Sequence, residues 1–177
     1  MRVFICVELS DEARKEIARI IEKIEQTGLI NAKYVEPENL HLTLKFLGEV
    51  EDSKIEEIKK QLNKIKFKKF KARLGSLGVF TPQYIKILWV ELLGEEIYKL
   101  KQEVDKLLES LFPEEKGFSS HVTIARVKSL KDRRVFLDMI QKEKLTGEFE
   151  VSNIKLKSST LTPEGPVYED ILEIKLD

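Results

Sequence analysis

The sequence is short of the residues and patterns on which several protein classes depend. It has one cysteine in 177 residues, which excludes an internal disulfide, and Cys6 lies in the apolar run 3–7, where we expect a buried thiol. No stretch approaches the 18 consecutive apolar residues of a membrane-spanning helix, and the run 3–7 is too short for a signal peptide. We expect a cytoplasmic protein that acts as a monomer and has no membrane partner.

The charges of the chain cancel. Lysine and arginine together number 31, as do aspartate and glutamate, so the formal net charge is zero. No overall positive field attracts nucleic acid, and any such affinity must come from a local patch. Hydrophobic residues make up 42%, enough for the interior of one domain, whereas charged residues make up 35%. A lysine- and glutamate-rich surface with little cysteine is typical of heat-adapted proteins.

Several catalytic signatures are also missing. The chain contains no cysteine cluster and no histidine-rich spacing that would hold zinc, and we expect neither a metal ion nor an organic cofactor. The segment 75–78 lacks the spacing and the following lysine of a phosphate-binding loop. No nucleophile elbow is visible, although composition alone does not exclude a Ser-His-Asp hydrolase.

Apolar periodicity predicts an alternation of strands and helices. The strands are expected over residues 2–9, 40–47, 85–93 and 120–127, and over the stretches of about 147–159 and 167–176. The helices are expected over residues 11–26, 53–65, 95–111 and 129–140. Capping sequences that begin at Ser53 and Ser129 support the starts of two of these helices.

Landmarks of the first half of the chain recur in the second half, 79 to 83 positions later and in the same order. They are Val-Glu-Leu at 7–9 and 90–92, His-Leu-Thr-Leu at 41–44 and His-Val-Thr-Ile at 121–124, phenylalanine at 70 and 149, and Thr-Pro at 81–82 and 162–163. We interpret this as a duplication within a single domain 1–177, with halves of about 1–82 and 83–177. Each half is predicted to run strand, helix, strand, helix, strand.

The only two histidines of the chain occupy equivalent places in this repeat. Residues i and i+2 of a strand point to the same face, so His41 shares a face with Thr43, and His121 shares one with Thr123. A pseudo-twofold relation would bring the two pairs together across a cleft. Two strand histidines that happen to precede threonines are the simpler alternative, but their register with the repeat favours a shared site.

This set of side chains suits the cleavage of a phosphodiester. In-line displacement needs a base to deprotonate the attacking oxygen and an acid to protonate the leaving oxygen, and histidine can serve as either near neutral pH. Two hydroxyls can bind the non-bridging oxygens. The sequence therefore predicts a metal-independent phosphoesterase with His41 and His121 as the acid–base pair and Thr43 and Thr123 on the phosphate. Residue chemistry does not say which histidine is the acid.

The blocks that contain these motifs resemble the 2H phosphoesterase superfamily, and most closely the RNA 2′,3′-cyclic phosphodiesterases, also called 2′-5′ RNA ligases. The resembling blocks are residues 2–9, 39–48, 88–90, 118–127 and 161–168. Ser120 departs from the pattern, because relatives often have proline before the second histidine. That difference touches no proposed catalytic role.

The resemblance implies a bilobal α+β fold with two pseudo-twofold-related lobes, each an antiparallel sheet with flanking helices, around a central cleft. It implies hydrolysis of RNA 2′,3′-cyclic phosphate ends, such as those of tRNA halves, to 2′-phosphomonoesters, and in some relatives the reverse 2′-5′ ligation. It assigns His41 as proton donor and His121 as proton acceptor. A non-catalytic RNA-binding module and an enzyme for small cyclic nucleotides remain as alternatives.

Further contacts to the substrate have weaker support. Lys45 follows Thr43 by two positions and is expected on the same face, whereas Arg126 reaches the face of His121 only if the strand ends or bulges. The basic run 64–73 is either an RNA track or a lysine-protected edge strand. Three tyrosine and phenylalanine residues could either stack on a base of the substrate or pack inside the protein, and Trp89 is expected in the core. Those three are Tyr34, Tyr84 and Phe118.

Overall fold

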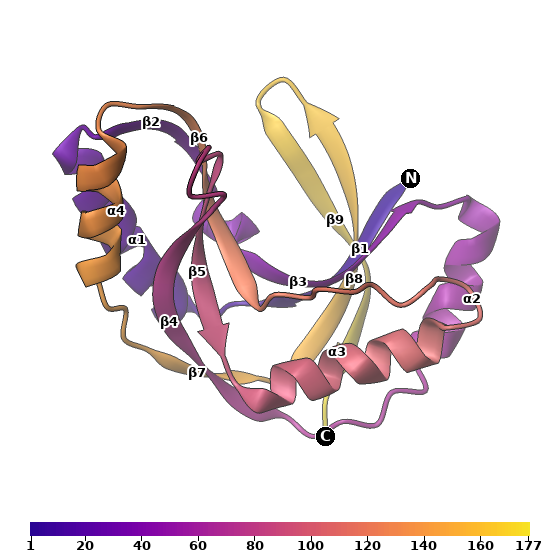
Figure 1. Cartoon of the computed structure of the whole chain (residues 1–177). Coiled ribbons are helices and arrows are strands. Elements are labelled where there is room, and N and C mark those ends of the chain that lie inside the picture. Colours follow the sequence, from indigo (N-terminus) through magenta and orange to yellow (C-terminus); the bar gives the residue numbers. More distant parts are fainter.

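The computed structural model describes residues 1–177 and contains four α-helices, one short 3-10 helix and nine strands (Figure 1). The helices are α1 (Asp11–Thr27), α2 (Asp52–Leu62), α3 (Glu95–Leu108) and α4 (Arg133–Lys142), and the 3-10 helix is η1 (Pro37–Asn39). The strands are β1 (Arg2–Glu8), β2 (Ile30–Tyr34), β3 (His41–Glu49), β4 (Phe70–Phe80), β5 (Ile87–Leu93), β6 (His121–Leu130), β7 (Glu148–Val151), β8 (Asn153–Thr162) and β9 (Gly165–Lys175). None of the four helices is both long and apolar enough to cross a membrane.

The strands form a curved, antiparallel sheet in the order β7-β4-β5-β6-β3-β1-β8-β9, with β2 also paired to β6. Two lobes meet in the middle of this order, where β3 and β6 pair through Leu42 and Val122 alone. One lobe holds β3, β1, β8 and β9, and the other holds β6, β5, β4, β7 and β2. The bilobal α+β prediction is confirmed, and the two sheets join edge to edge into one.

The order of strands reads alike from either side of the β3–β6 junction. Outward from it, β3-β1-β8 matches β6-β5-β4, and the repeated sequence motifs lie on equivalent strands. However, β4 comes from the first half of the chain and β8 from the second, so each lobe takes strands from both halves. The division at 82/83 falls in the connection between β4 and β5, and neither half makes a lobe by itself.

The helices also cross between lobes. Helix α1 follows β1 but contacts β2 and β7, whereas α3 follows β5 but contacts β3 and α2. Figure 1 shows α1 and α4 over one lobe and α2 and α3 over the other. Helix α1 begins where the hydroxyl of Ser10 accepts a hydrogen bond from the Ala13 amide, and it ends at Gly28, which has a positive φ of 62°.

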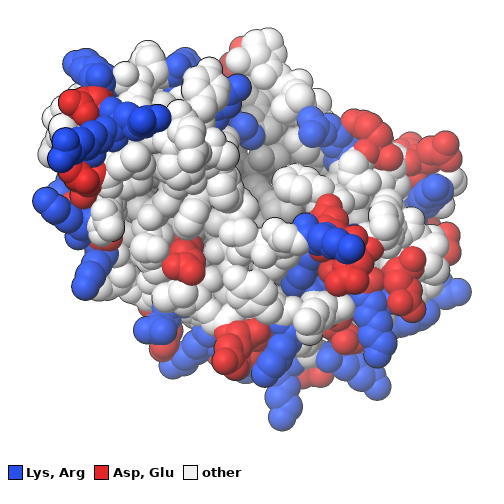
Figure 2. Space-filling model, viewed as in Figure 1, with Lys and Arg blue, Asp and Glu red and all other residues white.

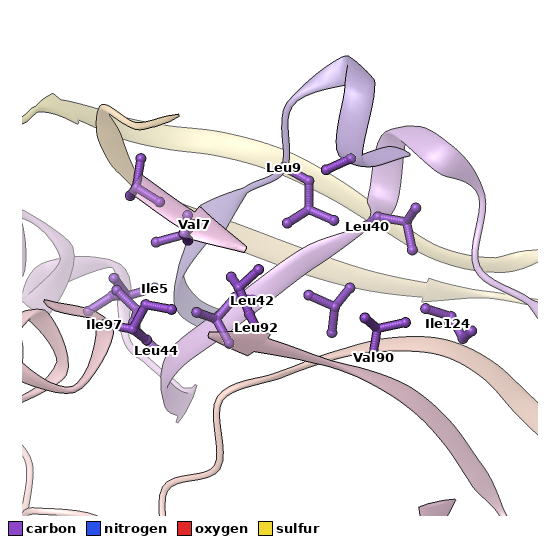
Figure 3. Packing of buried hydrophobic residues seen from close by; sticks show 14 of the residues in the cluster. Ile5, Val7, Leu9, Leu40, Leu42, Leu44, Val90, Leu92, Ile97 and Ile124 are labelled. Carbon is purple, nitrogen blue, oxygen red and sulfur yellow. The ribbon is translucent and has the colours of Figure 1, made fainter. Parts of the chain in front are cut away.

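The core lies between the helices and the outer face of the sheet, and 38 buried residues form one continuous cluster there. Figure 3 shows the part of this cluster nearest the junction, where Leu42 and Leu44 of β3 pack in the same layer as Val90 and Ile124. Because strand side chains alternate, burial of Leu42 and Val122 directs the flanking histidines and threonines to the opposite, concave face.

Three local predictions are corrected by the structure. The stretch 147–159 is not one strand, because Val151 pairs with Phe70 in one lobe whereas β8 pairs with β1 in the other. Strand β6 continues to Leu130, so α4 begins at Arg133 with Asp132 as its cap. Helix α2 begins at Asp52, one residue before the predicted capping box. Strand β2, which no apolar pattern indicated, is a short addition to β6.

Candidate active site

Both histidines lie on the concave face where the lobes meet. His41 is the first residue of β3 and His121 the first of β6, and both are half-buried, as are Thr43 and Thr123. Because the strands are antiparallel around the Leu42–Val122 pair, His41 neighbours Thr123 across the junction and His121 neighbours Thr43. Figure 2, in the same view as Figure 1, shows a hollow between the lobes. The structure thus brings the four residues of the two motifs together.

The two imidazoles are held in the same way. The Nδ1 atom of His41 lies 2.7 Å from the carbonyl oxygen of Asn39, and that of His121 lies 2.8 Å from the carbonyl oxygen of Ser119. A carbonyl oxygen can only accept, so each Nδ1 carries a proton and each Nε2 is left to exchange one. The Nε2 atom of His41 lies 3.1 Å from the Thr43 hydroxyl, which donates to it when the ring is neutral.

Aromatic rings flank each histidine. The ring centroid of His41 lies 5.0 Å from Phe4 and 5.4 Å from Tyr168. The ring centroid of His121 lies 5.0 Å from Phe80 and 6.1 Å from Trp89. The apolar strand predicts Trp89 in the core, but it is half-buried and lies on the histidine face. Gly78 makes room for Trp89, because a Cβ atom at that position would lie 2.2 Å from the indole ring. These rings restrict how the imidazoles can rotate.

The surroundings of His41 favour its neutral form. Burial lowers the pKa of His41, and the charge of Lys157 acts in the same direction. The Asn39 carbonyl and the Glu8 carboxylate oppose this shift but do not cancel it. The neutral ring is therefore the resting form of His41 at neutral pH.

A closed ring of four charged side chains lies beside His41. Glu8, the cross-strand partner of His41, accepts from Lys157 at 2.5 Å and contacts Lys155 at 3.0 Å. Asp170 contacts Lys155 at 2.7 Å and Lys157 at 3.2 Å. Burial disfavours both carboxylates, but the hydrogen bonds from the two lysines outweigh it and lower the pKa of Glu8 and of Asp170. The ring carries no net charge.

Arg126 reaches the histidine face because β6 bulges. Ile124 and Ala125 are both buried, where strict alternation would bury only one, and the register with β5 shifts at this point. The exposed Arg126 therefore points the same way as His121 and Thr123. Its charge reaches Tyr168 in the other lobe: burial raises the pKa of Tyr168, and Arg126 acts against that rise.

An equivalent bulge in β3 removes Lys45 from this face, which corrects the sequence prediction. Leu44 and Lys45 are both buried, and Lys45 is only 1% exposed. Its ammonium donates to Asp105 of α3 at 2.6 Å and to the Pro113 carbonyl at 2.8 Å. Phe46, which is 62% exposed, takes the place on the histidine face that Arg126 has in the other lobe. Alignment of the two repeats could have indicated that Lys45 is buried, since Lys45 matches the small buried residue Ala125.

The remaining candidates separate into packed and exposed residues. Lys69 and Lys71 of the basic run 64–73 pair with Glu150 and Glu148 of β7 at 4.0 and 3.3 Å, and the phenylalanines of the run pack against the core. Only residues 70–73 of the run belong to a strand, and this strand, β4, lies between β5 and β7 and not at an edge of the sheet. Residues 64–69 connect α2 to β4. Tyr34 and Phe118 also pack against the core, whereas Tyr84 is 70% exposed. No group of three or more His, Cys, Asp or Glu side chains is placed to hold a metal ion.

Comparison with known proteins agrees with this arrangement over the whole chain. The family model described as LigT like Phosphoesterase matches twice, over residues 7–89 and 88–168. A Methanocaldococcus jannaschii protein named RNA 2′,3′-cyclic phosphodiesterase is 38% identical over 98% of this chain and 99% of its own, and an Archaeoglobus fulgidus protein of the same name is 37% identical over 97% and 98%. The crystal structure of the Thermus thermophilus protein TT0787 superposes with a TM-score of 0.88 at 27% identity, covering 99% of this chain and 98% of the other. Apo LigT of E. coli, at 20% identity and a TM-score of 0.78 over 99% and 96%, shares the fold. The chain belongs to the LigT-like phosphoesterase family.

Proposed function

We propose that this protein hydrolyses the 2′,3′-cyclic phosphate end of RNA to a 2′-phosphomonoester by acid–base catalysis between its two histidines. The observation that carries the proposal is the equivalent pair of Nδ1–carbonyl hydrogen bonds, which leaves the Nε2 atoms of both histidines on the concave face. Each histidine has a threonine of the other motif as its cross-strand neighbour. The names of the relatives supply the substrate class.

The reaction assigns one proton transfer to each lobe. Thr43 and Thr123 donate hydrogen bonds to the non-bridging oxygens of the cyclic phosphate. The Nε2 atom of His121 accepts a proton from water as its oxygen attacks phosphorus, and the P–O3′ bond breaks as protonated His41 donates to O3′. The products are a 2′-phosphate, a free 3′ hydroxyl, protonated His121 and neutral His41. Exchange of both protons with solvent restores the starting state.

Substrate binding and protonation of His41 are coupled in this scheme. Burial lowers the pKa of His41, whereas a bound phosphodiester adds a negative charge next to Nε2 and stabilises the imidazolium. The acid is therefore formed when the substrate arrives. Arg126, on the same face, stabilises the additional negative charge on phosphorus oxygens in the transition state.

The nucleoside of the cyclic end lies on the His41 side in this proposal. Phe46 presents an exposed ring there, 6.2 Å from the ring of Phe4, and single-stranded RNA ends are commonly held by stacking of a base on an aromatic side chain. Stacking on Phe46 positions O3′ toward His41, the proton donor.

Product analysis tests the proposal. A short RNA with a 2′,3′-cyclic phosphate end is incubated in EDTA with the wild type, with His41→Ala and with His121→Ala. We expect the wild type to release only the 2′-phosphate and each variant to be slower by about 10²- to 10⁴-fold, the usual contribution of a positioned acid or base. Glu56→Gln, a change at an exposed helix residue, is the matched control and keeps full activity.

Other outcomes select between the alternatives. Binding of the RNA without ring opening would favour a recognition module, and equal turnover of a cyclic mononucleotide and the RNA would favour a small-nucleotide enzyme. Loss of wild-type activity in EDTA would contradict the metal-independent mechanism.

A further inference from the structure

A groove of about 660 Å³ opens beyond the candidate active site, between the end of β6, the loop that joins β4 to β5, and the start of α4. Its volume lies within the range of roughly 300–1,000 Å³ that is usual for ligand clefts. Apart from Arg126, none of its residues takes part in the proposed reaction. The residues that matter here are Tyr84, Lys86, Ile87, Arg126, Lys128 and Arg133.

The cations of this groove have no carboxylate partners. Lys86, Arg126, Lys128 and Arg133 form no ion pair, in contrast to Lys69 and Lys71, which pair with carboxylates of β7. The carboxylate of Asp132, next to Arg133 in sequence, caps α4 by accepting from the Val135 amide. In a chain of zero net charge, this is a local excess of positive charge. Figure 2 shows basic side chains along the upper edge of the hollow between the lobes.

The groove is continuous with the candidate site. Arg126 belongs to both, and its cross-strand partner Ile87 lies two residues along β5 from Trp89, which contacts His121. Strand β6 advances seven residues from His121 to Lys128, about 23 Å at roughly 3.3 Å per residue. The cations therefore follow the strand away from the histidines over the length of several nucleotides.

The groove also presents an aromatic surface. Tyr84 is 70% exposed, and the Lys86 ammonium lies 4.9 Å from its ring centroid. The Arg133 guanidinium donates to the Gln83 carbonyl at 3.0 Å, which ties α4 to the loop that carries Tyr84. A positive groove with an exposed ring is the arrangement by which proteins hold single strands without reading their sequence.

We propose that this groove binds the single-stranded RNA segment on the 5′ side of the cyclic-phosphate end. Lys86, Lys128 and Arg133 contact its backbone phosphates, and Tyr84 stacks on one of its bases. The proposal rests on the proposed function, because the cyclic end must occupy the histidine site for the strand to enter the groove. It identifies the preferred substrate as an oligonucleotide and not a cyclic mononucleotide, which leaves the groove empty.

The test compares kcat/KM for a cyclic mononucleotide and for an octanucleotide with a cyclic end, over a series of salt concentrations. The groove variant is Lys128→Gln/Arg133→Gln, and the control is Lys69→Gln/Lys71→Gln, which removes two lysines that the β7 carboxylates already neutralise. For the octanucleotide, the slope of log kcat/KM against log salt becomes shallower by about 1.4 in the groove variant, since each lost phosphate contact accounts for about 0.7. Turnover of the mononucleotide changes less than about twofold in both variants.

A second variant keeps the test independent of charge. Tyr84→Ala lowers kcat/KM for the octanucleotide by about fivefold or more through lost stacking, and leaves the mononucleotide unaffected. An unchanged salt slope in the groove variant, with the octanucleotide still preferred, overturns the groove proposal while the proposed function stands. Equal kcat/KM for the two substrates in the wild type overturns the groove proposal and also favours the small-nucleotide enzyme. If the wild type turns over neither substrate, the proposed function fails. In that case the affinity for the octanucleotide is measured by fluorescence anisotropy in the wild type and in the groove variant. The groove proposal then requires the same difference between the two in the slope of log affinity against log salt.

Discussion

Replacing Asp105 by asparagine should destabilise the protein strongly, because this carboxylate balances two buried lysines. Lys45 is 1% exposed and Lys101 3%. The Lys45 ammonium lies 2.6 Å from Asp105 Oδ1, and the Lys101 ammonium lies 2.8 and 2.7 Å from its two oxygens. The only other carboxylate within 4.0 Å of either ammonium belongs to Glu115, at 3.9 Å from Lys101.

The magnitude follows from the burial of both partners. Removing one member of a buried ion pair costs about 3–5 kcal/mol, since it leaves an uncompensated charge away from water. For a chain of this length each kcal/mol shifts Tm by about 2–4 °C, so Asp105→Asn should lower Tm by about 6–20 °C. Lys45→Met should cost less, because Asp105 keeps its two contacts to Lys101.

Thermal and urea unfolding of Asp105→Asn, Lys45→Met and Glu56→Gln provide the assay. Glu56 pairs with Lys59 on the exposed face of α2, and its loss should cost less than about 1 kcal/mol. At a temperature where it is folded, Lys45→Met should keep the activity of the wild type. A loss of stability in Asp105→Asn no larger than that in Glu56→Gln would contradict the role of Asp105 as the balancing charge. A stable but inactive Lys45→Met would contradict the placement of Lys45 outside the active site.

Three further predictions concern the histidine face. NMR titration of the His41 ring should give a pKa below its ordinary value of about 6.5 in the free protein and a higher one with a bound 2′-nucleotide; an identical pKa in both would contradict the coupling of binding to protonation. Because the folded pKa of His41 is lowered, the unfolded chain binds more protons below pH 6.5, and stability should fall as the pH drops from there through the folded pKa. His41→Gln should show a smaller loss in urea unfolding over that window, and an equal loss would point to other groups. Gly78→Ala should cost about 1–3 kcal/mol and slow turnover, since its Cβ would displace Trp89 from His121. Gly75→Ala, whose Cβ meets only side-chain atoms at 3.1 Å or more, should be milder by both measures.

The faces of the histidine motifs could be predicted from the sequence because they depend on local geometry. Alternation within a strand needs no knowledge of the fold, and it placed His41 with Thr43 and His121 with Thr123. The same rule failed at Lys45, where a bulge shifts the parity of the strand after Leu44. A bulge is set by cross-strand packing, which a single segment does not reveal.

The wider surroundings of the site depend on contacts between distant segments. Tyr168 reaches His41 only because β8, from the second half of the chain, pairs with β1. The crossed helices have the same origin, since amphipathic periodicity shows that α1 has an apolar face but not which lobe this face covers. Residues 147–159 divide into two strands because β7 pairs with β4 and β8 pairs with β1. The apolar parity changes between Val151 and Ile154, but the sequence does not show that the pairing partner changes there.

A substrate with sulfur in place of the bridging 3′ oxygen distinguishes the proton donor from the proton acceptor. A thiolate leaves without a proton, because the pKa of a thiol is far below that of an alcohol. His41→Ala, slow on the oxygen substrate, should then open the sulfur-containing ring within about tenfold of the wild-type rate, whereas His121→Ala should stay slow on both. Rescue of His121→Ala instead, with His41→Ala still slow, would reverse the two roles and contradict the account.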